Sequence, residues 1–146
     1  MSPPKISPKY YAGLNTKDAK LQKMYIRRSH RESEKGVYRV RPTPKSYKQK
    51  PSRHVVDFKR IYGVSTKNTK KISVLTGVTA SKQKKVLSKG SGAYFSSGSR
   101  PGQTPSSWAY ARLSSVLLGR DACKTDEHIL LPITCRELRS RARRSL

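Results

Sequence analysis

Acidic residues are scarce in this chain. Of its 146 residues, 33 are Lys or Arg and 8 are Asp or Glu, which gives a formal net charge of +25 at pH 7. No acid lies between Asp57 and Asp121, whereas twelve Lys and Arg lie in that interval. With so few counter-charges, the cations would repel one another in a compact body unless an acidic partner neutralised them. We therefore expect the excess charge to face a negatively charged macromolecule.

Long apolar runs are also missing. The apolar fraction is 34%, below the roughly 45–50% of ordinary globular chains. The longest apolar runs, at 116–118 and 129–131, fall far short of the ~18 residues that a membrane span requires. The sequence thus predicts neither a secretory signal nor a transmembrane segment. Eight of the aromatic residues are Tyr, which suits interfaces better than deep cores, so we expect a thin core.

Groups that bind metals or catalyse reactions are few and scattered. Cys123 and Cys135 stand twelve residues apart without a CxxC pattern or a matching histidine spacing, so two buried thiols of a reducing compartment are favoured over a zinc site. The three histidines are isolated, and the stretch 58–120 contains no paired carboxylates for acid–base catalysis. The sequence predicts no enzyme, no catalytic residue, no metal site and no cofactor.

Capping residues and apolar spacing predict a mainly α fold of about four to five short helices, with a small α+β fold as the alternative. A helix over 15–36 starts at a capping residue, carries Leu21, Tyr25 and Met24 on its inner face and stops at a glycine. A second helix over 52–63 has the same kind of limits. Extended basic arms are expected at both ends of the chain.

Two short helices are predicted over 67–76 and 81–89, with Gly77 between them. A DNA-binding helix-turn-helix is one interpretation. An ordinary helical hairpin is favoured, because Gln83 occupies a position where that motif needs an apolar residue.

The helix predicted over 105–118, with Thr104 as its cap and Pro105 at its start, is the expected centre of the core. Its small residues allow another element to approach closely. Residues 126–135 are interpreted as one short strand bent at Pro132. The residues expected in the core are Tyr94, Trp108, Leu113, Val116 and Leu117.

Residues 90–104, GSGAYFSSGSRPGQT, are interpreted as a glycine–serine loop before that helix. Backbone N–H groups at a helix N-terminus can hold a phosphate or carboxylate. The loop lacks both the G-K-S/T of a Walker loop and the strand that precedes a dinucleotide-binding fingerprint. A structured turn is favoured over an anion-binding turn, and catalysis ranks last. The anion-binding candidates are Arg100, Ser97, Ser99 and Thr104.

Lys and Arg alternate with Tyr over 38–54, YRVRPTPKSYKQKPSRH. Such a segment can neutralise phosphates while its rings stack, or it can lie along an acidic protein surface. Uniform charge without a recognition helix argues against sequence-specific DNA reading. The candidate partner contacts are Arg27, Arg28, Arg31, Arg39, Arg41, Lys45, Lys48, Lys50, Arg139, Arg141, Arg143 and Arg144.

Three parts are expected along the chain. Residues 1–51 form a basic extended arm with one helix, residues 52–131 form a small helical domain that includes the glycine–serine loop, and residues 132–146 form a basic C-terminal tail.

The stretch KGSGAYFSSGSRPGQTPSSWAYARLSSVLLG, within residues 89–120, and the upstream RHVVDFKRIYGV carry a resemblance. Over about residues 45–130 the chain resembles a domain of unknown function found in small basic proteins of large double-stranded DNA viruses, algal and amoebal, and of some phages. After the main helix, Arg120-Asp121-Ala122-Cys123 stands where such members often carry a second glycine and small residues, which puts the role of that turn in doubt.

The family has no assigned activity, so the resemblance implies a setting, that of a large icosahedral DNA virus. We expect a non-enzymatic minor capsid protein, present in multiple copies on the inner side of the shell, that cements acidic surfaces of the major capsid protein and other capsid proteins. The alternative is a packaged nucleic-acid-binding protein that neutralises or condenses viral DNA without sequence specificity. A ribosome-associated protein fits the charge but not the family pattern. The expected location is the virion, with the host cytoplasm or viral factory before assembly.

Overall fold

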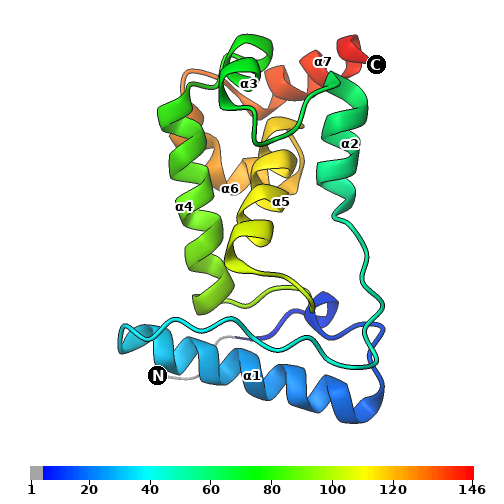
Figure 1. The fold of residues 1–146 in the computed structure, drawn as a ribbon. Coiled ribbons are helices and arrows are strands. Elements are labelled where there is room, and N and C mark those ends of the chain that lie inside the picture. Colours follow the sequence, from blue (N-terminus) through cyan, green and yellow to red (C-terminus); the bar gives the residue numbers. More distant parts are fainter. Residues whose placement is uncertain (1–4) are drawn as a thin grey trace. The chain divides into compact units, whose positions relative to one another are not determined.

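The computed structural model describes residues 5–146, and within them it contains helices and no strand (Figure 1). The short 3-10 helix η1 (Pro8–Tyr10) precedes seven α-helices. These are α1 (Thr16–Glu34), α2 (Arg53–Tyr62), α3 (Thr69–Thr76), α4 (Ala80–Ser96), α5 (Pro105–Leu117), α6 (Asp121–Leu130) and α7 (Cys135–Ser145). The mainly α prediction is confirmed, although the described residues hold more helices than the four to five expected.

The chain divides into two compact units. Within the described residues, the first contains residues 5–50 together with Ser91–Trp108, and the second contains Pro51–Gly90 together with Ala109–Leu146. Two of the three boundaries fall within α4 and α5, and the third, between Lys50 and Pro51, lies between α1 and α2. This division differs from the expected parts, because most of the glycine–serine segment belongs with the N-terminal residues and the C-terminal residues belong with the helical domain.

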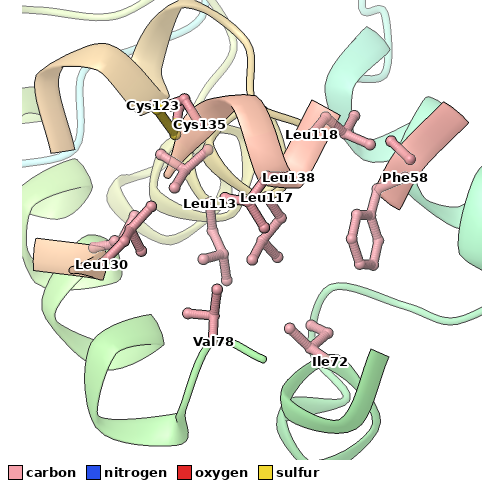
Figure 2. Packing of buried hydrophobic residues seen from close by; sticks show 13 residues of the cluster. Phe58, Ile72, Val78, Leu113, Leu117, Leu118, Cys123, Leu130, Cys135 and Leu138 are labelled. Atoms are coloured by element: carbon pink, nitrogen blue, oxygen red, sulfur yellow. A yellow bond between two sulfur atoms is a disulfide. The ribbon is translucent and has the colours of Figure 1, made fainter. Parts of the chain in front are cut away.

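The core of the second unit forms around α5, which lies among the other helices of that unit (Figures 1 and 2). Leu113, Val116 and Leu117 are fully buried, as the sequence predicts. Burying each such side chain contributes roughly 1.5–3 kcal/mol relative to exposure. Every other helix of the unit adds a fully buried residue, namely Phe58, Ile72, Val86, Leu130 and Leu138.

Small residues let α4 and α5 approach closely. A Cβ atom added at Gly90 of α4 would lie 2.7 Å from the Cα and 3.2 Å from the Cβ of Ala109 in α5. Only glycine fits this contact without a shift of the backbone. Gly90 lies inside α4, so the loop that the sequence predicts from residue 90 begins only after α4 ends at Ser96.

The strand predicted over 126–135 is wrong. α6 continues to Leu130, the Leu131–Pro132 peptide bond is cis, and α7 begins at Cys135. Thr134 is the N-cap of α7, and its Oγ1 accepts a hydrogen bond from the backbone N–H of Glu137 at 3.2 Å. A threonine followed three residues later by glutamate is a helix-start signature. The apolar run across Pro132, which resembles a strand in the sequence, therefore consists of the end of α6, a turn and the start of α7.

The C-terminal residues form a packed helix rather than a tail alone. Cys135, Leu138 and Ala142 recur at helical spacing and are buried in the core of the second unit. α7 packs against α2 and α6. The arginines of this segment occupy the remaining sides of an amphipathic helix.

Cys123 and Cys135 form a disulfide bond, so the expectation of two buried thiols is wrong (Figure 2). Their Cα atoms lie 5.8 Å apart, within the range that a disulfide spans. The bond joins α6 to the first residue of α7 within the core, and it closes the turn that contains Pro132.

α1 begins and ends as predicted, but a different face is buried. Asn15 accepts a hydrogen bond from the backbone N–H of Asp18 at 2.8 Å, and the helix stops before Gly36. Leu21 is half-buried and Met24 is 51% exposed, so the predicted apolar inner face is wrong. The residues buried on α1 are Asp18, Gln22, Ile26 and Ser29.

Hydrogen bonds explain this polar buried face. Gln22 Nε2 donates to the carbonyl of Ser99 at 3.5 Å, and Ser29 Oγ donates to the carbonyl of Phe95 at 3.4 Å. Polar side chains of α1 thus satisfy backbone carbonyls in the last turn of α4 and in the segment that follows it. Apolar periodicity therefore gives the wrong inner face for this helix.

Of the aromatic residues expected in the core, Tyr94 is fully buried and Trp108 is not. Trp108 is half-buried, and its ring meets the Tyr10 ring edge to face at a centroid distance of 5.8 Å. The prediction that Trp108 is a buried core residue is corrected accordingly.

Candidate anion-binding surface

Asp126 is held inside the second unit by two cations. It is fully buried, and its carboxylate accepts hydrogen bonds from Arg112 Nε and Nη2, both at 2.8 Å, while Lys89 Nζ lies 3.0 Å away. Burial by itself would raise the pKa of Asp126, but the hydrogen bonds from Arg112 and Lys89 outweigh it and hold this pKa below its usual value.

Asp57 anchors a second cluster in the same unit. Arg120 Nη2 donates to Asp57 Oδ2 at 2.6 Å, and Arg53 and Arg60 each lie 3.7 Å from the carboxylate. The hydrogen bond from Arg120 lowers the pKa of Asp57. Arg120 Nη1 also lies 3.0 Å from His54 Nδ1. This cluster ties the turn after α5 to α2.

The acids of the first unit are engaged in the same way. Asp18 Oδ2 accepts a hydrogen bond from the backbone N–H of Ser46 at 2.9 Å, and the bond to Ser46 lowers the pKa of Asp18. Glu32 pairs with Arg28 at 2.7 Å and with Arg39 at 3.4 Å, and the hydrogen bond from Arg28 lowers the pKa of Glu32.

The four remaining acids also have internal roles. Glu34 lies 3.0 Å from His30 Nε2, and Glu127 accepts a hydrogen bond from the backbone N–H of Cys135 at 2.8 Å. Asp121 and Glu137 lie in the first turns of α6 and α7, where the helix dipole favours a negative charge. All eight Asp and Glu side chains thus serve internal contacts or helix N-termini, and most cations of the described residues 5–146 have no acidic side chain to pair with.

One group of these cations covers the outer face of α1. This face lies opposite the buried stripe of the helix, and its cations are exposed. Arg27, Arg28 and Arg31 lie where the sequence predicts, at the C-terminal half of the face. Lys17 and Lys20, in the N-terminal half of this face, are not among the predicted partner contacts, although they recur at the same helical spacing. With neighbouring side chains, they line a shallow depression formed by Thr16, Lys17, Lys20, Leu21 and Met24.

A second group lies on α4. Its exposed side chains are short hydroxyls and lysines, and Lys89 of this group also contacts Asp126. None of the predicted partner contacts lies on this face, although its run of lysines is visible in the sequence. The residues that line its shallow depression are Ser81, Lys84, Lys85, Ser88, Lys89 and Ile129.

The extended segment after α1 contributes four exposed cations of the predicted set, namely Arg39, Lys45, Lys48 and Lys50. Arg41 of the same set is buried, with 9% of its surface exposed, so its position does not fit a partner contact.

Arg41 holds the first unit together. Its Nη1 donates to Ser29 Oγ at 3.0 Å and to the Tyr94 carbonyl at 2.6 Å, and its Nη2 donates to Ser99 Oγ at 2.8 Å. The guanidinium lies 3.7 Å from the centroid of the Tyr94 ring, and the Tyr94 hydroxyl accepts the Arg41 backbone N–H at 2.7 Å. Burial lowers the pKa of Arg41. No sequence pattern distinguishes this arginine from its exposed neighbours.

The C-terminal arginines differ among themselves. Arg139 Nη1 donates to the carbonyl of Gly119 at 3.0 Å, and Arg141 Nη1 donates to the carbonyl of Leu75 at 3.3 Å. Arg143 and Arg144 are exposed and form no ion pair with the residues that the structure describes. The first two stabilise helix ends, and the last two face solvent.

The anion-binding candidates of the glycine–serine segment do not converge on one point. Ser99 is buried, accepts from Arg41 and donates to the carbonyl of Arg100 at 2.9 Å. Thr104 Oγ1 accepts the backbone N–H of Ser107 at 3.0 Å and so caps α5 as predicted. Arg100 and Ser97 are exposed.

Residues 5–146 contain no group of three or more His, Cys, Asp or Glu side chains arranged to hold a metal ion. Within the same residues, no helix combines the length and the apolar character that crossing a membrane requires. The depressions on α1 and α4 are open to solvent.

Comparison with known proteins identifies a family. No curated protein and no solved structure matches the chain. The model of DUF5824, described as a family of unknown function, matches residues 7–129. The match extends further toward the N-terminus than the resemblance over 45–130 and takes in η1 and α1. Because the match covers most of its length, the chain belongs to the family of unknown function DUF5824.

Proposed function

We propose that the chain is a non-enzymatic structural protein of a large DNA virus particle, a minor capsid protein that binds acidic surfaces of capsid proteins on the inner side of the shell. The observation that carries this proposal is the division of charge. All eight carboxylates serve internal contacts or helix N-termini, whereas exposed cations cover α1, the segment after it, α4 and the end of α7. The surface therefore presents a large excess of positive charge, and an anionic partner complements it.

The distribution of the cations favours several contacts over one deep site. They lie on four separate elements and line two shallow depressions. A protein that cements neighbouring capsomers needs contact surfaces of this kind, and it needs no cleft. Arg, which dominates the C-terminal half of α1 and the end of α7, binds carboxylates bidentately.

Nucleic-acid binding is a second candidate function, and the face of α4 favours it. Its exposed side chains are lysines and serines, which are suited to phosphate oxygens. If this face determined the function, the chain would bind duplex DNA without sequence preference, and the affinity would fall steeply with salt.

The test compares two ligands for the purified full-length chain, DNA-free shells of the virus that encodes it and duplex DNA, each at increasing salt. The proposal predicts saturable binding to shells at regular positions and weaker binding to DNA. Replacing Arg143 and Arg144 by Ala should weaken shell binding while the far-UV circular dichroism stays unchanged. Binding to DNA alone would refute the capsid proposal and support the second candidate.

A further inference from the structure

We propose that the outer face of α1 is a docking surface for an acidic protein segment that also carries apolar side chains. Here the outer face means Lys17, Lys20, Leu21, Met24, Arg27 and Arg31. The inference rests on the proposed function, because it takes the partner to be an acidic protein, and it goes further by naming the surface and the character of the segment that binds it.

The geometry of the helix defines this face. The buried stripe of α1 runs through Asp18, Gln22, Ile26 and Ser29. At about 100° per residue, the outer-face residues other than Leu21 lie within about 45° of the opposite direction. Leu21 lies at the edge of the face.

Cations flank the apolar centre of this face, which consists of Met24 and, toward the edge, Leu21. Lys17 and Lys20 lie on the N-terminal side of Met24, Arg27 and Arg31 lie on its C-terminal side, and all four cations are exposed. None of these four forms an ion pair with another residue of the described chain 5–146. Their charges are therefore available to a partner, whereas Arg28, at the edge of the face, pairs with Glu32.

The apolar centre separates a protein partner from nucleic acid. Met24 is 51% exposed and Leu21 is half-buried, and both line the depression on this face. A phosphate backbone gains nothing from methionine and leucine, whereas a protein segment can bury them against its own apolar residues. Methionine is well suited to such contacts because its flexible side chain adapts to different shapes. The face of α4, with lysine and serine around its depression, has no comparable centre apart from Ile129.

Charge and apolar area together define the partner. The rim requires carboxylates, and the centre requires at least one apolar side chain between them. A membrane surface is a poorer fit, because a helix that lies in a bilayer buries a broad apolar face and this one offers two side chains. The matching occupant is an acidic amphipathic segment of another protein.

The experiment measures binding of four probes to the full-length chain. The probes are a synthetic helical peptide with Glu on one face and Leu on the other, poly-glutamate, duplex DNA and vesicles containing phosphatidylserine. We expect Leu21→Ser together with Met24→Ser to lower the affinity for the Glu/Leu peptide about tenfold, as loss of a central apolar anchor does. The same variant should leave the affinities for poly-glutamate and DNA unchanged.

Charge variants provide the matched control. Arg27→Gln with Arg31→Gln should weaken binding of the Glu/Leu peptide, whereas Lys84→Gln with Lys85→Gln removes the same charge from α4 and should weaken it much less. Met24→Glu is a second variant of the apolar centre, which removes the apolar contact and also adds a negative charge. It replaces a side chain that is already 51% exposed, so it keeps the test valid if the double serine variant does not fold.

Three results would overturn the inference. The first is an unchanged peptide affinity in both apolar variants, which would make the face purely electrostatic. The second is an equal loss from the α4 control. The third is binding to vesicles that is tighter than binding to the Glu/Leu peptide and that is lost in Met24→Glu. This result would identify a membrane as the partner.

The failure of this inference can be told apart from failure of the proposed function. If wild-type chain and Met24→Glu bind DNA-free shells equally well, the docking face is wrong and the capsid proposal stands. If wild-type chain binds the Glu/Leu peptide through α1 but does not bind shells, the docking face stands and the capsid proposal is wrong.

Discussion

Gly90 and Gly92 lie two residues apart in α4, and replacing each by Ala should change stability in opposite directions. A Cβ at Gly92 has nothing within 4 Å, so Gly92→Ala should stabilise the protein by about 1 kcal/mol through helix propensity. A Cβ at Gly90 would lie 2.7 Å from the Cα of Ala109, well inside the roughly 3.5–4.0 Å of a normal carbon contact. The two helices must move apart to accept it.

The size of the destabilisation by Gly90→Ala depends on which atom the added Cβ contacts, and here that atom is the backbone Cα of Ala109. Overpacking a core typically costs about 1–3 kcal/mol, and the upper end applies here because a backbone atom cannot rotate away. Helix propensity returns about 1 kcal/mol, so Gly90→Ala should lower the free energy of unfolding by about 2 kcal/mol. Urea denaturation followed by far-UV circular dichroism measures both variants. If Gly90→Ala stabilises the protein as much as Gly92→Ala, the close approach of α4 and α5 is refuted.

Three further predictions concern the second unit. Asp126→Asn should cost about 1.5–3 kcal/mol by removing the carboxylate charge that accepts hydrogen bonds from Arg112 and pairs with Lys89. Because the folded state lowers the pKa of Asp126, the stabilisation is complete above the unfolded pKa of about 4 and is lost as the pH falls through the folded pKa, so a thermal melt that does not change on acidification would contradict the pairing. Reducing the bond between Cys123 and Cys135, which are 12 residues apart, should lower the free energy of unfolding by about 3 kcal/mol, and identical melts with and without reductant would argue against the disulfide. Arg139→Ala should cost about 1 kcal/mol by removing its hydrogen bond to a helix-end carbonyl, whereas Arg143→Ala should leave the melt unchanged, and equal losses would mean that both arginines contribute to the fold.

Helix limits could be predicted from the sequence because they depend on local chemistry. Asn15 caps α1, and Gly63 and Gly77 end α2 and α3 in the left-handed conformation at φ values of 71° and 78°. These signals need only a few neighbouring residues. The limits of α6 and α7 were missed, although Thr134 and Glu137 carry a capping signature, because the apolar run across Pro132 also fits a strand.

Features that depend on distant residues could not be predicted in the same way. The disulfide requires two Cα atoms to lie 5.8 Å apart, and the sequence separation does not fix that distance. Gln83 donates to the carbonyls of Thr69 and Val78 at 3.2 and 2.9 Å, so a polar residue at an inner position stabilises the hairpin of α3 and α4. Such roles appear only when the chain is folded.

The exposed cations of the candidate anion-binding surface could be predicted from the sequence only in part, because the burial of one of them depends on distant residues. Most of the arginines and lysines singled out from the charge pattern are exposed. Arg41 was assigned to the surface with them, yet it is buried against Tyr94, 53 positions further along the chain. On α1 the cations were placed correctly, and the apolar residues beside them were expected to face inward because apolar spacing alone does not say which face is covered.

The proposed function takes the chain to be part of a virus particle, and its most direct test locates the protein within purified particles of the virus proposed to encode it. The particles are opened, the shell is separated from the DNA, and the chain is quantified in both fractions at increasing salt. The proposed function predicts that the chain stays with DNA-free shells and is released only when salt screens the carboxylate contacts. Recovery of the chain with the DNA and its absence from the shells would contradict it.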